Sequence, residues 1–361
     1  MSFANEATAI APGSLPETAQ ACVLATEAVT LTPDLAAITG ILPPTKLGWW
    51  ERGFKKAGLT AVARRSEELR RAWATFKYSS SFDAVVTLGT LEGLAFAALQ
   101  RLRGSKRPVH LMYDCLWYGG NSVKKLWMQF CLKTVDYCVV WASVERHRFA
   151  EAYGINEEKF LFVPHHHTLS RYIYEVGDDG YVFTGGNADR DYGLFFDAVR
   201  NIEVPCLLAT NRPQLLDGLS VPPNVRLVSA SPAEFRKLMA KARLVVMPMN
   251  AKLLHAGAQQ SILNAMMMGK PVVLTDPEGG SDYIENGGTG ILVPYGDPIK
   301  LKKAIEGLLA NPSEVKAMGE RARSAAASFT TANCNAIIWK HAIELLNRRK
   351  SVSQPSGMGI S

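Results

Sequence analysis

The chain has 361 residues and a formal net charge of +7, with 47% hydrophobic and 20% charged residues. This composition is typical of a globular protein, and the length favours two domains that each bury a core. No apolar run approaches the roughly 18 residues of a transmembrane helix, and the first thirty residues lack the basic start of a secretory signal. The six cysteines are scattered without metal-ligand spacing, which indicates reduced thiols.

Basic residues gather in the first half of the chain. Between Lys46 and Lys133 the sequence has 16 basic and 6 acidic residues, whereas the remainder is slightly acidic. Such an uneven distribution suggests an anionic partner, which would be a phosphorylated ligand, a membrane surface or a nucleic acid. A basic face that is simply solvated is an equal alternative.

In chain order, we expect a variable leader over residues 1–33 and then a Rossmann-like domain over 34–172. Short β-branched runs that alternate with helical patterns predict the strands of this domain. Such alternation indicates βαβ units and a parallel sheet. The predicted strands are 35–42, 59–64, 83–90, 108–114, 136–143 and 160–165.

The pattern pauses near 168–180 and restarts, which predicts a second Rossmann-like domain over 173–330. Its predicted strands are 180–186, 206–210, 225–230, 242–249, 271–276 and 289–295. A C-terminal helix over 331–350, expected to pack back on the first domain, and a flexible tail over 351–361 follow. The predicted fold class is therefore α/β, with two doubly wound domains that face a central cleft. Ligands of such sheets bind outside the carboxyl ends of strands, so residues just after strands are the candidates.

Three candidate residues of the first half follow or end predicted strands. Lys46 in "PPTKLG" could meet a phosphate, and Trp49 begins "WWERGFKKA", which resembles an interfacial helix with aromatics beside cations. The equal alternative is that Trp50 and Phe54 pack on the sheet. Asp114 ends a strand and could accept a proton from a hydroxyl, or only bind it.

Three adjacent histidines, 165–167, end the last predicted strand of the first domain. Neighbouring side chains of an extended chain point to opposite sides, so these histidines cannot readily share one metal ion. We therefore expect no metal site, and we expect His165 or His166 to face the cleft at the hinge between the domains.

The segment "HAGAQQSILNAMMMGKPVVLTD" (255–276) predicts a loop, a helix, a glycine stop and a strand. The first N–H groups of a helix lack internal partners and carry the positive end of its dipole, which favours an anion. Small residues leave the backbone open, two glutamines supply donors, and a serine can cap locally. A diphosphate fits this chemistry, and an ordinary capped helix is the alternative. The residues concerned are Ala256, Gly257, Ala258, Gln259, Gln260 and Ser261.

Four consecutive motifs resemble the second domain of retaining glycosyltransferases of family 4, which have the GT-B fold. They are "YVFTGGNADRDYGLFFDAV", "NAMMMGKPVV", "DYIENGGTGILVPYGDP" and "IKLKKAIEGLLANP". The resemblance covers about 180–330 and is weak in the first domain. It implies transfer of a sugar from a nucleotide-activated donor, which the second domain binds while the first faces the acceptor. The resemblance requires no cofactor or metal, because helix N-termini and an arginine can balance the diphosphate charge.

The chain departs from this family at the donor site. The family grips the donor with a Glu-x7-Glu pair, at the sugar and at the ribose, and here Ala256 and Asn264 stand at those positions. An amide can still bond a ribose hydroxyl, more weakly than a carboxylate does. Backbone groups of the "AGAQQ" loop, or Gln259 and Gln260, would then replace the missing sugar contact. The base would be bound largely by the backbone near 228–231.

The resemblance also implies a donor contact at the glycine turn after the first strand of the second domain, at Gly185 and Gly186. The lysine that the family usually has there is missing, and Arg190 is the cation that can clamp a diphosphate bidentately. The alternative is an ion pair of Arg190 with Asp189 or Asp191, the second of which could also cap the next helix.

The sequence thus predicts a glycosyltransferase in the cytosol or on the inner face of a membrane. It would move a hexose to a hydroxyl of a polysaccharide or lipid-linked acceptor, with Asp114, Arg190 and Asn264 as candidate catalytic residues. Its expected partners are a nucleotide sugar, that acceptor and, peripherally, an anionic membrane; no nucleic-acid module is recognisable. Two alternatives stay open: a sugar-nucleotide 2-epimerase of the same fold, and a catalytically degenerate protein that binds nucleotide sugar.

Overall fold

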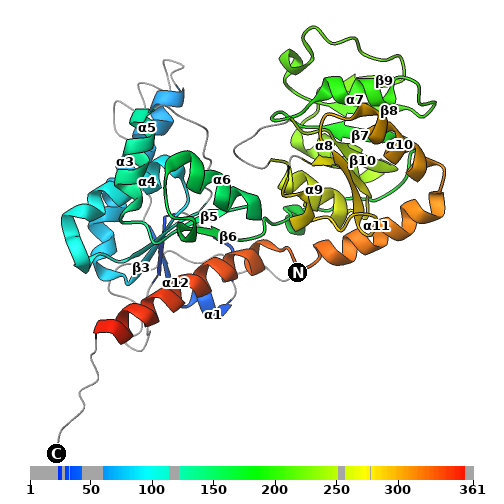
Figure 1. The fold of residues 1–361 in the computed structure, drawn as a ribbon. Helices are drawn as coiled ribbons and strands as arrows, with labels where there is room; N and C mark the ends of the chain where they lie inside the picture. Colours follow the sequence, from blue (N-terminus) through cyan, green and yellow to red (C-terminus); the bar gives the residue numbers. More distant parts are fainter. Residues whose placement is uncertain are drawn as a thin grey trace, which may run out of the picture. The chain divides into compact units, whose positions relative to one another are not determined.

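The structure is a computed structural model, and it describes residues 23–26, 29–31, 33–42, 60–113, 122–250, 257–276 and 278–353. The chain divides into two compact units (Figure 1). The first comprises Met1–Val140, Arg146–Val163 and Thr331–Ser361, and the second comprises Trp141–Glu145 and Pro164–Thr330. Each unit contains a six-stranded sheet in which every strand pairing is parallel. The predicted α/β class with two doubly wound units is therefore confirmed.

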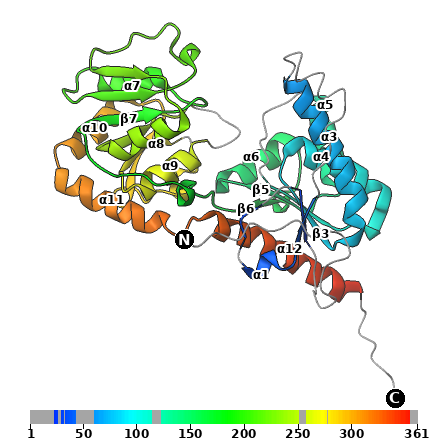
Figure 2. The same cartoon turned by 180° about the vertical axis from the view of Figure 1, so that it is seen from behind.

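The first unit has the strand order β2-β1-β3-β4-β5-β6. Its central strands are buried along their whole length, as expected of a parallel sheet with helices on both faces. The strands are β1 Val23–Ala25, β2 Thr39–Ile41, β3 Ala84–Thr87, β4 Val109–Met112, β5 Tyr137–Val140 and β6 Phe160–Phe162. The helices that surround them are α1 Pro33–Ala36, α3 Thr60–Tyr78, α4 Thr90–Gln100, α5 Ser122–Leu132, α6 Ser143–Tyr153 and α12 Thr331–Ser353 (Figures 1 and 2).

Two sequence predictions for this unit are wrong. Residues 1–33 were expected to form a leader, but Val23–Ala25 is a fully buried strand between β2 and β3. No Gly, Pro, Asn, Asp or Ser directly flanks this short apolar run, so the sequence does not mark its ends as it does those of the predicted strands. The run 59–64 was expected to be a strand, but Thr60 begins the long helix α3. Its apolar residues belong to the helical pattern of a 19-residue helix. A window of six residues is too short to show that pattern.

The C-terminal helix α12 belongs to the first unit. Trp339 is fully buried, and its indole Nε1 donates to Thr39 Oγ1 of β2 at 2.9 Å. Near the other end of the helix, Arg349 donates to Asp136, which also accepts two bonds from Arg107 at 2.8 and 3.1 Å. Burial alone would raise the pKa of Asp136, but these arginines hold it below its ordinary value. The helix is thus fastened to the sheet by one buried aromatic ring and one ion-paired carboxylate.

A buried histidine on β4 makes the stability of this unit depend on pH. His110 is fully buried, its Nε2 lies 3.0 Å from Thr87 Oγ1, and burial lowers its pKa to about 3. Below pH 6.5 the unfolded chain takes up a proton here that the folded chain does not. We therefore expect His110 to make the free energy of unfolding fall as the pH drops from about 6.5 towards 3, and His110→Gln to remove that part of the slope.

Chemical unfolding of both proteins between pH 7.5 and 4.5 measures this slope. His147 of α6 is the control for replacing an exposed histidine, because its side chain is 74% exposed and His147→Gln should keep the part of the slope that His110 causes. An identical pH dependence of the wild type and His110→Gln would mean that the buried imidazole is protonated in the folded chain.

The second unit has the strand order β12-β11-β10-β7-β8-β9. The chain runs from β7 outwards to β9 and then returns to β10 beside β7, so the order reverses between β7 and β10. A reversal of this kind opens a crevice at the carboxyl ends of the two strands, which is where ligands bind. The strands are β7 Val182–Gly185, β8 Cys206–Ala209, β9 Val225–Val228, β10 Leu244–Met247, β11 Val272–Asp276 and β12 Gly290–Pro294. The helices are α7 Tyr192–Val199, α8 Pro232–Lys241, α9 Gln259–Met267, α10 Pro298–Leu309 and α11 Pro312–Ala326.

Candidate functional site

The glycine turn after β7 forms one side of the crevice. A Cβ on Gly185 would lie 2.6 Å from the Phe235 ring and 2.7 Å from the carbonyl oxygen of Ala209, so a side chain does not fit. Gly186 has a φ of +134°, a conformation that strongly favours glycine. These two glycines let the backbone of the turn lie close to α8 and to the end of β8.

Arg190 lies inside this turn. Its guanidinium is buried and donates from Nε to the carbonyl of Gly185 at 3.1 Å and from Nη1 to the carbonyl of Ala188 at 3.0 Å. Nη1 also contacts Met249 Sδ at 3.2 Å, beside the end of β10. Nε and Nη1 thus each donate to a carbonyl of the protein's own turn, and the role of Arg190 as a diphosphate clamp stays a prediction. Asp191 has the predicted capping role, since its Oδ1 accepts from Leu194 N at 2.9 Å at the start of α7.

The start of α9 forms the opposite side. The helix follows Ala258, which has a φ of +75° and, as the N-cap residue, makes no side-chain capping hydrogen bond. Ser261 is the third residue of the helix and does not occupy the N-cap position. A left-handed alanine is an uncommon, strained conformation that the surrounding structure must hold in place. Gly257 lies next to it, with Asp189 Oδ2 3.5 Å from where its Cβ would be.

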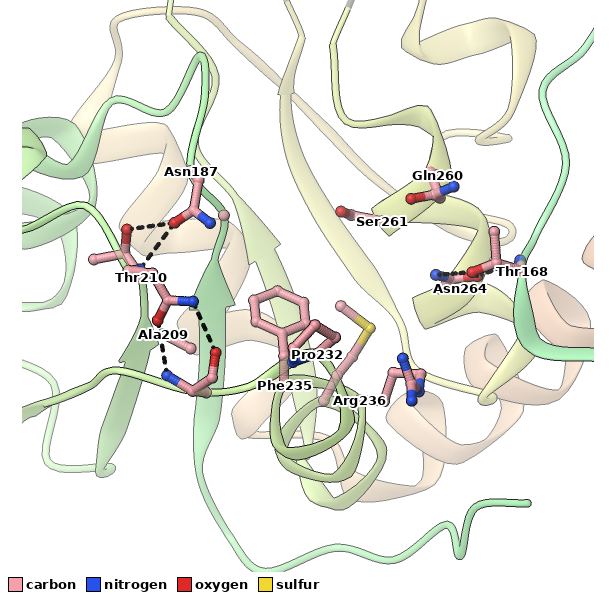
Figure 3. Close-up of a pocket in the computed structure, with 14 residues that line it drawn as sticks. Thr168, Asn187, Ala209, Thr210, Pro232, Phe235, Arg236, Gln260, Ser261 and Asn264 are labelled. Atoms are coloured by element: carbon pink, nitrogen blue, oxygen red, sulfur yellow. Dashed lines mark hydrogen bonds between the residues drawn. The ribbon is translucent and has the colours of Figure 1, made fainter. Parts of the chain in front are cut away.

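A pocket of about 260 Å³ occupies the crevice between these two sides (Figure 3). Gln260, Ser261 and Asn264 lie along α9 on one wall, and Asn187 and Thr210 lie on the other. The floor comes from α8. The remaining lining residues are Thr168, Gly186, Ala209, Asn211, Ala230, Pro232, Phe235, Arg236 and Met239. Mixed apolar and amide walls around one aromatic ring suit a ligand with a flat ring and several hydroxyls.

Asn264 reaches this pocket while it is bonded to Thr168. The backbone N–H of Thr168 donates to Asn264 Oδ1 at 2.9 Å, and Asn264 Nδ2 donates to Thr168 Oγ1 at 3.1 Å. The amide is therefore oriented before any ligand arrives. Sequence reasoning missed Thr168, because 96 residues separate it from its partner.

The sequence analysis also did not predict the amide side chains that line the other wall of the pocket. Asn211, just after β8, donates from Nδ2 to the carbonyl of Ala230 at 2.9 Å and accepts from Ala230 N at 3.0 Å. Asn187 Oδ1 accepts from Thr210 Oγ1 at 3.0 Å and from Asn211 N at 2.9 Å. These bonds tie together the loops that follow β7, β8 and β9. The sequence signal that could have identified Asn211 as a site residue is its position just after β8.

Two aromatic contacts shape the pocket floor. Phe235 packs edge-on against Phe183 of β7, with ring centroids 5.2 Å apart. The Arg236 guanidinium lies 3.7 Å from the ring centroid of Tyr172. Among the described residues that line the pocket, Arg236 is the one that carries a positive charge.

Several predicted residues lie elsewhere in the second unit. His165 donates its backbone N–H to Tyr283 Oη at 2.9 Å, and its ring packs against Trp141 and His166. Burial, followed by the neighbouring histidines, lowers the pKa of His166 to about 4. Within the described ranges, no three His, Cys, Asp or Glu side chains gather so that they could hold a metal ion. Gln259 is buried beside Gly257 in a smaller hollow on the other side of α9.

The remaining predictions cannot be placed. Lys46, Trp49, Asp114 and Ala256 lie outside the described residues. Of the helices that are described, none is both long and apolar enough to cross a bilayer.

Comparison with known proteins gives a family match in the second unit and solved structures of similar fold. Residues 182–311 match the family model of glycosyl transferases group 1. HepE from Anabaena, solved in complex with UDP, is similar in fold, with a TM-score of 0.64 at 13% identity over 90% of this chain and 100% of that one. The same protein in complex with UDP-glucose gives a TM-score of 0.62 at 14% identity over 91% and 100%. No curated protein matches the chain by sequence.

Two further solved structures resemble the chain. Sucrose-phosphate synthase from Thermosynechococcus elongatus has a TM-score of 0.58 at 16% identity over 80% of each chain. The lipopolysaccharide outer core galactosyltransferase WaaB has a TM-score of 0.56 at 14% identity over 79% of this chain and 81% of that one. At these identities the likeness establishes a common two-domain GT-B-like fold. The chain therefore has a GT-B-like architecture and carries, over residues 182–311, a domain of the glycosyl transferases group 1 family.

Proposed function

We propose that the protein transfers a hexose from a nucleotide sugar to a hydroxyl of a polysaccharide or lipid-linked acceptor, with retention of configuration. The observation that carries this proposal is the pocket at the switch point, between the glycine turn and the start of α9. It lies in the region that matches the glycosyl transferase family, and it combines features that suit each part of a nucleotide sugar.

The pocket suggests how the donor would be held. The base would lie against Phe235, the ribose hydroxyls would bond the Asn264 amide, and the diphosphate would approach the turn at Gly186 and the first turn of α9. Backbone N–H groups at a helix start stabilise negative charge as it grows on the leaving phosphate. Arg236 would add a cation from the floor. Asp114 remains our candidate for binding or deprotonating the acceptor hydroxyl.

Product analysis tests the proposal. The full chain is incubated with labelled UDP-, GDP-, ADP- and dTDP-hexoses and a mixture of glycan and lipid-linked acceptors. Transfer of label to an acceptor, with release of the nucleoside diphosphate and a retained anomer by NMR, is the expected result. An epimerised nucleotide sugar would identify a 2-epimerase, and binding without turnover would identify a degenerate donor-binding protein. The second alternative is favoured by Asn264, which stands where the family has a glutamate.

Arg236→Gln is expected to weaken binding of the nucleoside diphosphate by about tenfold or more, because one charge-assisted contact of about 1.5 kcal/mol is lost. Binding of the corresponding nucleoside should change much less, since the guanidinium is assigned to the phosphates. Calorimetric titration of both ligands measures the difference. Arg226→Gln on β9 is the matched control, because Arg226 does not line this pocket. Equal losses for nucleoside and nucleoside diphosphate would assign Arg236 to the base or ribose instead.

A further inference from the structure

Asn264 presents only part of its amide to the donor pocket. Its Oδ1 accepts from the backbone N–H of Thr168 at 2.9 Å. The Thr168 hydroxyl oxygen lies 3.1 Å from Nδ2, which donates to it, and 3.4 Å from Oδ1 (Figure 3). An atom at such similar distances from both ends of the amide lies at the edge between them. Thr168 therefore covers the edge on which the amide oxygen and one amide hydrogen point in the same direction.

The two segments that make this contact are both held by the core of the second unit. The backbone N–H of His167 donates to the carbonyl of Phe329 at 2.9 Å, and Leu169 is buried. On α9, Leu263 directly precedes Asn264 and is fully buried in the same apolar cluster as Leu169. Neither segment can move away without breaking this packing, so the covered edge is part of the pocket before a ligand enters.

The covered edge limits what the amide can offer a ligand. An asparagine side chain has two acceptor sites on its oxygen and two donor hydrogens on its nitrogen. Thr168 uses one of each, and the remaining lone pair and hydrogen lie on opposite sides of the amide and point apart. The two hydroxyls of a ribose are vicinal and point the same way, so Asn264 can bond one of them but not both. A ligand that took over the covered edge would leave the Thr168 N–H without its acceptor, which costs free energy.

The neighbouring lining residues are assigned to other parts of the ligand or are apolar. Gln260 and Ser261 lie one turn earlier on α9, near the helix start where the proposed function places the diphosphate. Arg236 is assigned to the phosphates as well. Phe235 and Met239 of the floor are apolar and offer no hydrogen bond to a hydroxyl. The ribose contact therefore depends on one group of one amide.

We propose that this site reads a single ribose hydroxyl, and that it therefore binds 2′-deoxyribonucleoside diphosphate sugars as well as it binds their ribose counterparts. A 2′-deoxyribose keeps its 3′-hydroxyl, which satisfies the one group of Asn264 that faces the ligand. Loss of the 2′-oxygen removes no hydrogen bond to this amide, because its second pair of groups faces Thr168. The inference rests on the proposed function, and it narrows the ribose contact given there to one hydroxyl.

Paired nucleotides that differ in one oxygen atom test this inference on the full chain. UDP, GDP and ADP are each compared with the 2′-deoxy nucleotide of the same base by calorimetric titration. For every base that binds, the two dissociation constants of the wild type should agree within about threefold. Asn264→Glu should bind the ribose form at least tenfold more tightly than the deoxy form. Glutamate is one methylene longer, so its two oxygens can extend past Thr168 and accept from both hydroxyls.

Gln260→Glu is the matched control, because it adds the same charge one turn earlier on α9, where Gln260 is exposed. It should weaken binding of both members of a pair equally. A wild-type preference of tenfold or more for the ribose form, or an Asn264→Glu variant that prefers neither form, would overturn the inference while the donor site itself would stand. Failure of every nucleotide to bind would instead contradict the proposed function, and this inference with it.

Discussion

Replacing Arg190 by alanine is expected to lower the free energy of unfolding by about 2–4 kcal/mol. The side chain is buried, and it makes two hydrogen bonds to carbonyls of the glycine turn and one contact with Met249. Its loss leaves those buried carbonyls without a donor and frees the turn that borders the pocket. Donor affinity should fall as a consequence, to a similar extent for a nucleoside monophosphate and a nucleoside diphosphate.

Denaturant unfolding and calorimetric titration of the same variant measure both effects. Arg212→Ala serves as a control for the loss of a positive charge, because Arg212 is exposed at the start of the short helix η5 (Pro213–Leu216). It should leave stability and binding nearly unchanged. If Arg190→Ala kept its stability and lost affinity only for the diphosphate, Arg190 would be the clamp that the sequence suggested.

Replacing Asn264 by leucine is expected to weaken donor binding by about tenfold or more, which corresponds to at least one lost hydrogen bond of roughly 1.4 kcal/mol. Leucine has a similar size but cannot bond a ribose hydroxyl, and it leaves the N–H of Thr168 without its acceptor. Asn264→Glu should also lower turnover, because a carboxylate near the diphosphate costs about 1 kcal/mol or more at 4 Å in water. Steady-state kinetics with the true donor measures both variants.

Thr168→Val separates the loss of the Asn264–donor contact from the loss of the Asn264–Thr168 contact. Valine keeps the backbone N–H that donates to Asn264 but removes the hydroxyl that accepts from it, so a small loss of affinity is expected. A native KM and turnover of Asn264→Leu would show that Asn264 does not touch the donor.

Most of the alternation of strands and helices could be predicted from the sequence because short apolar, β-branched runs alternate with helical patterns. Strand β1 was missed although β2 and β6 are equally short, because no Gly, Pro, Asn, Asp or Ser directly flanks Val23–Ala25 to mark its ends. Asn264, Gln260, Ser261 and Gly186 were predicted from motif order and from the rule that ligands bind after strands, and the structure brings them to one pocket. These predictions used features that are local in sequence.

The rest of the site depends on packing between distant segments. The sequence does not reveal that Arg190 donates to two carbonyls of its own turn. Phe235 and Arg236 lie inside an amphipathic helix, where nothing marks one turn as the floor of a pocket. Thr168 belongs to a connecting segment whose partner is on α9. Such residues can be found only once the fold has placed them.

Thermal unfolding of the full chain with UDP-, GDP-, ADP- and dTDP-hexoses tests the central claim most directly. A ligand that binds only the folded chain raises its stability by mass action, by about 2.7 kcal/mol at a hundred times Kd. The account predicts a saturable rise in the unfolding temperature with at least one nucleotide sugar, and a right-shifted concentration dependence in Asn264→Leu but not in Arg212→Ala. No rise with any nucleotide sugar, or a rise that Asn264→Leu leaves unchanged, would contradict the assignment of this pocket to the donor.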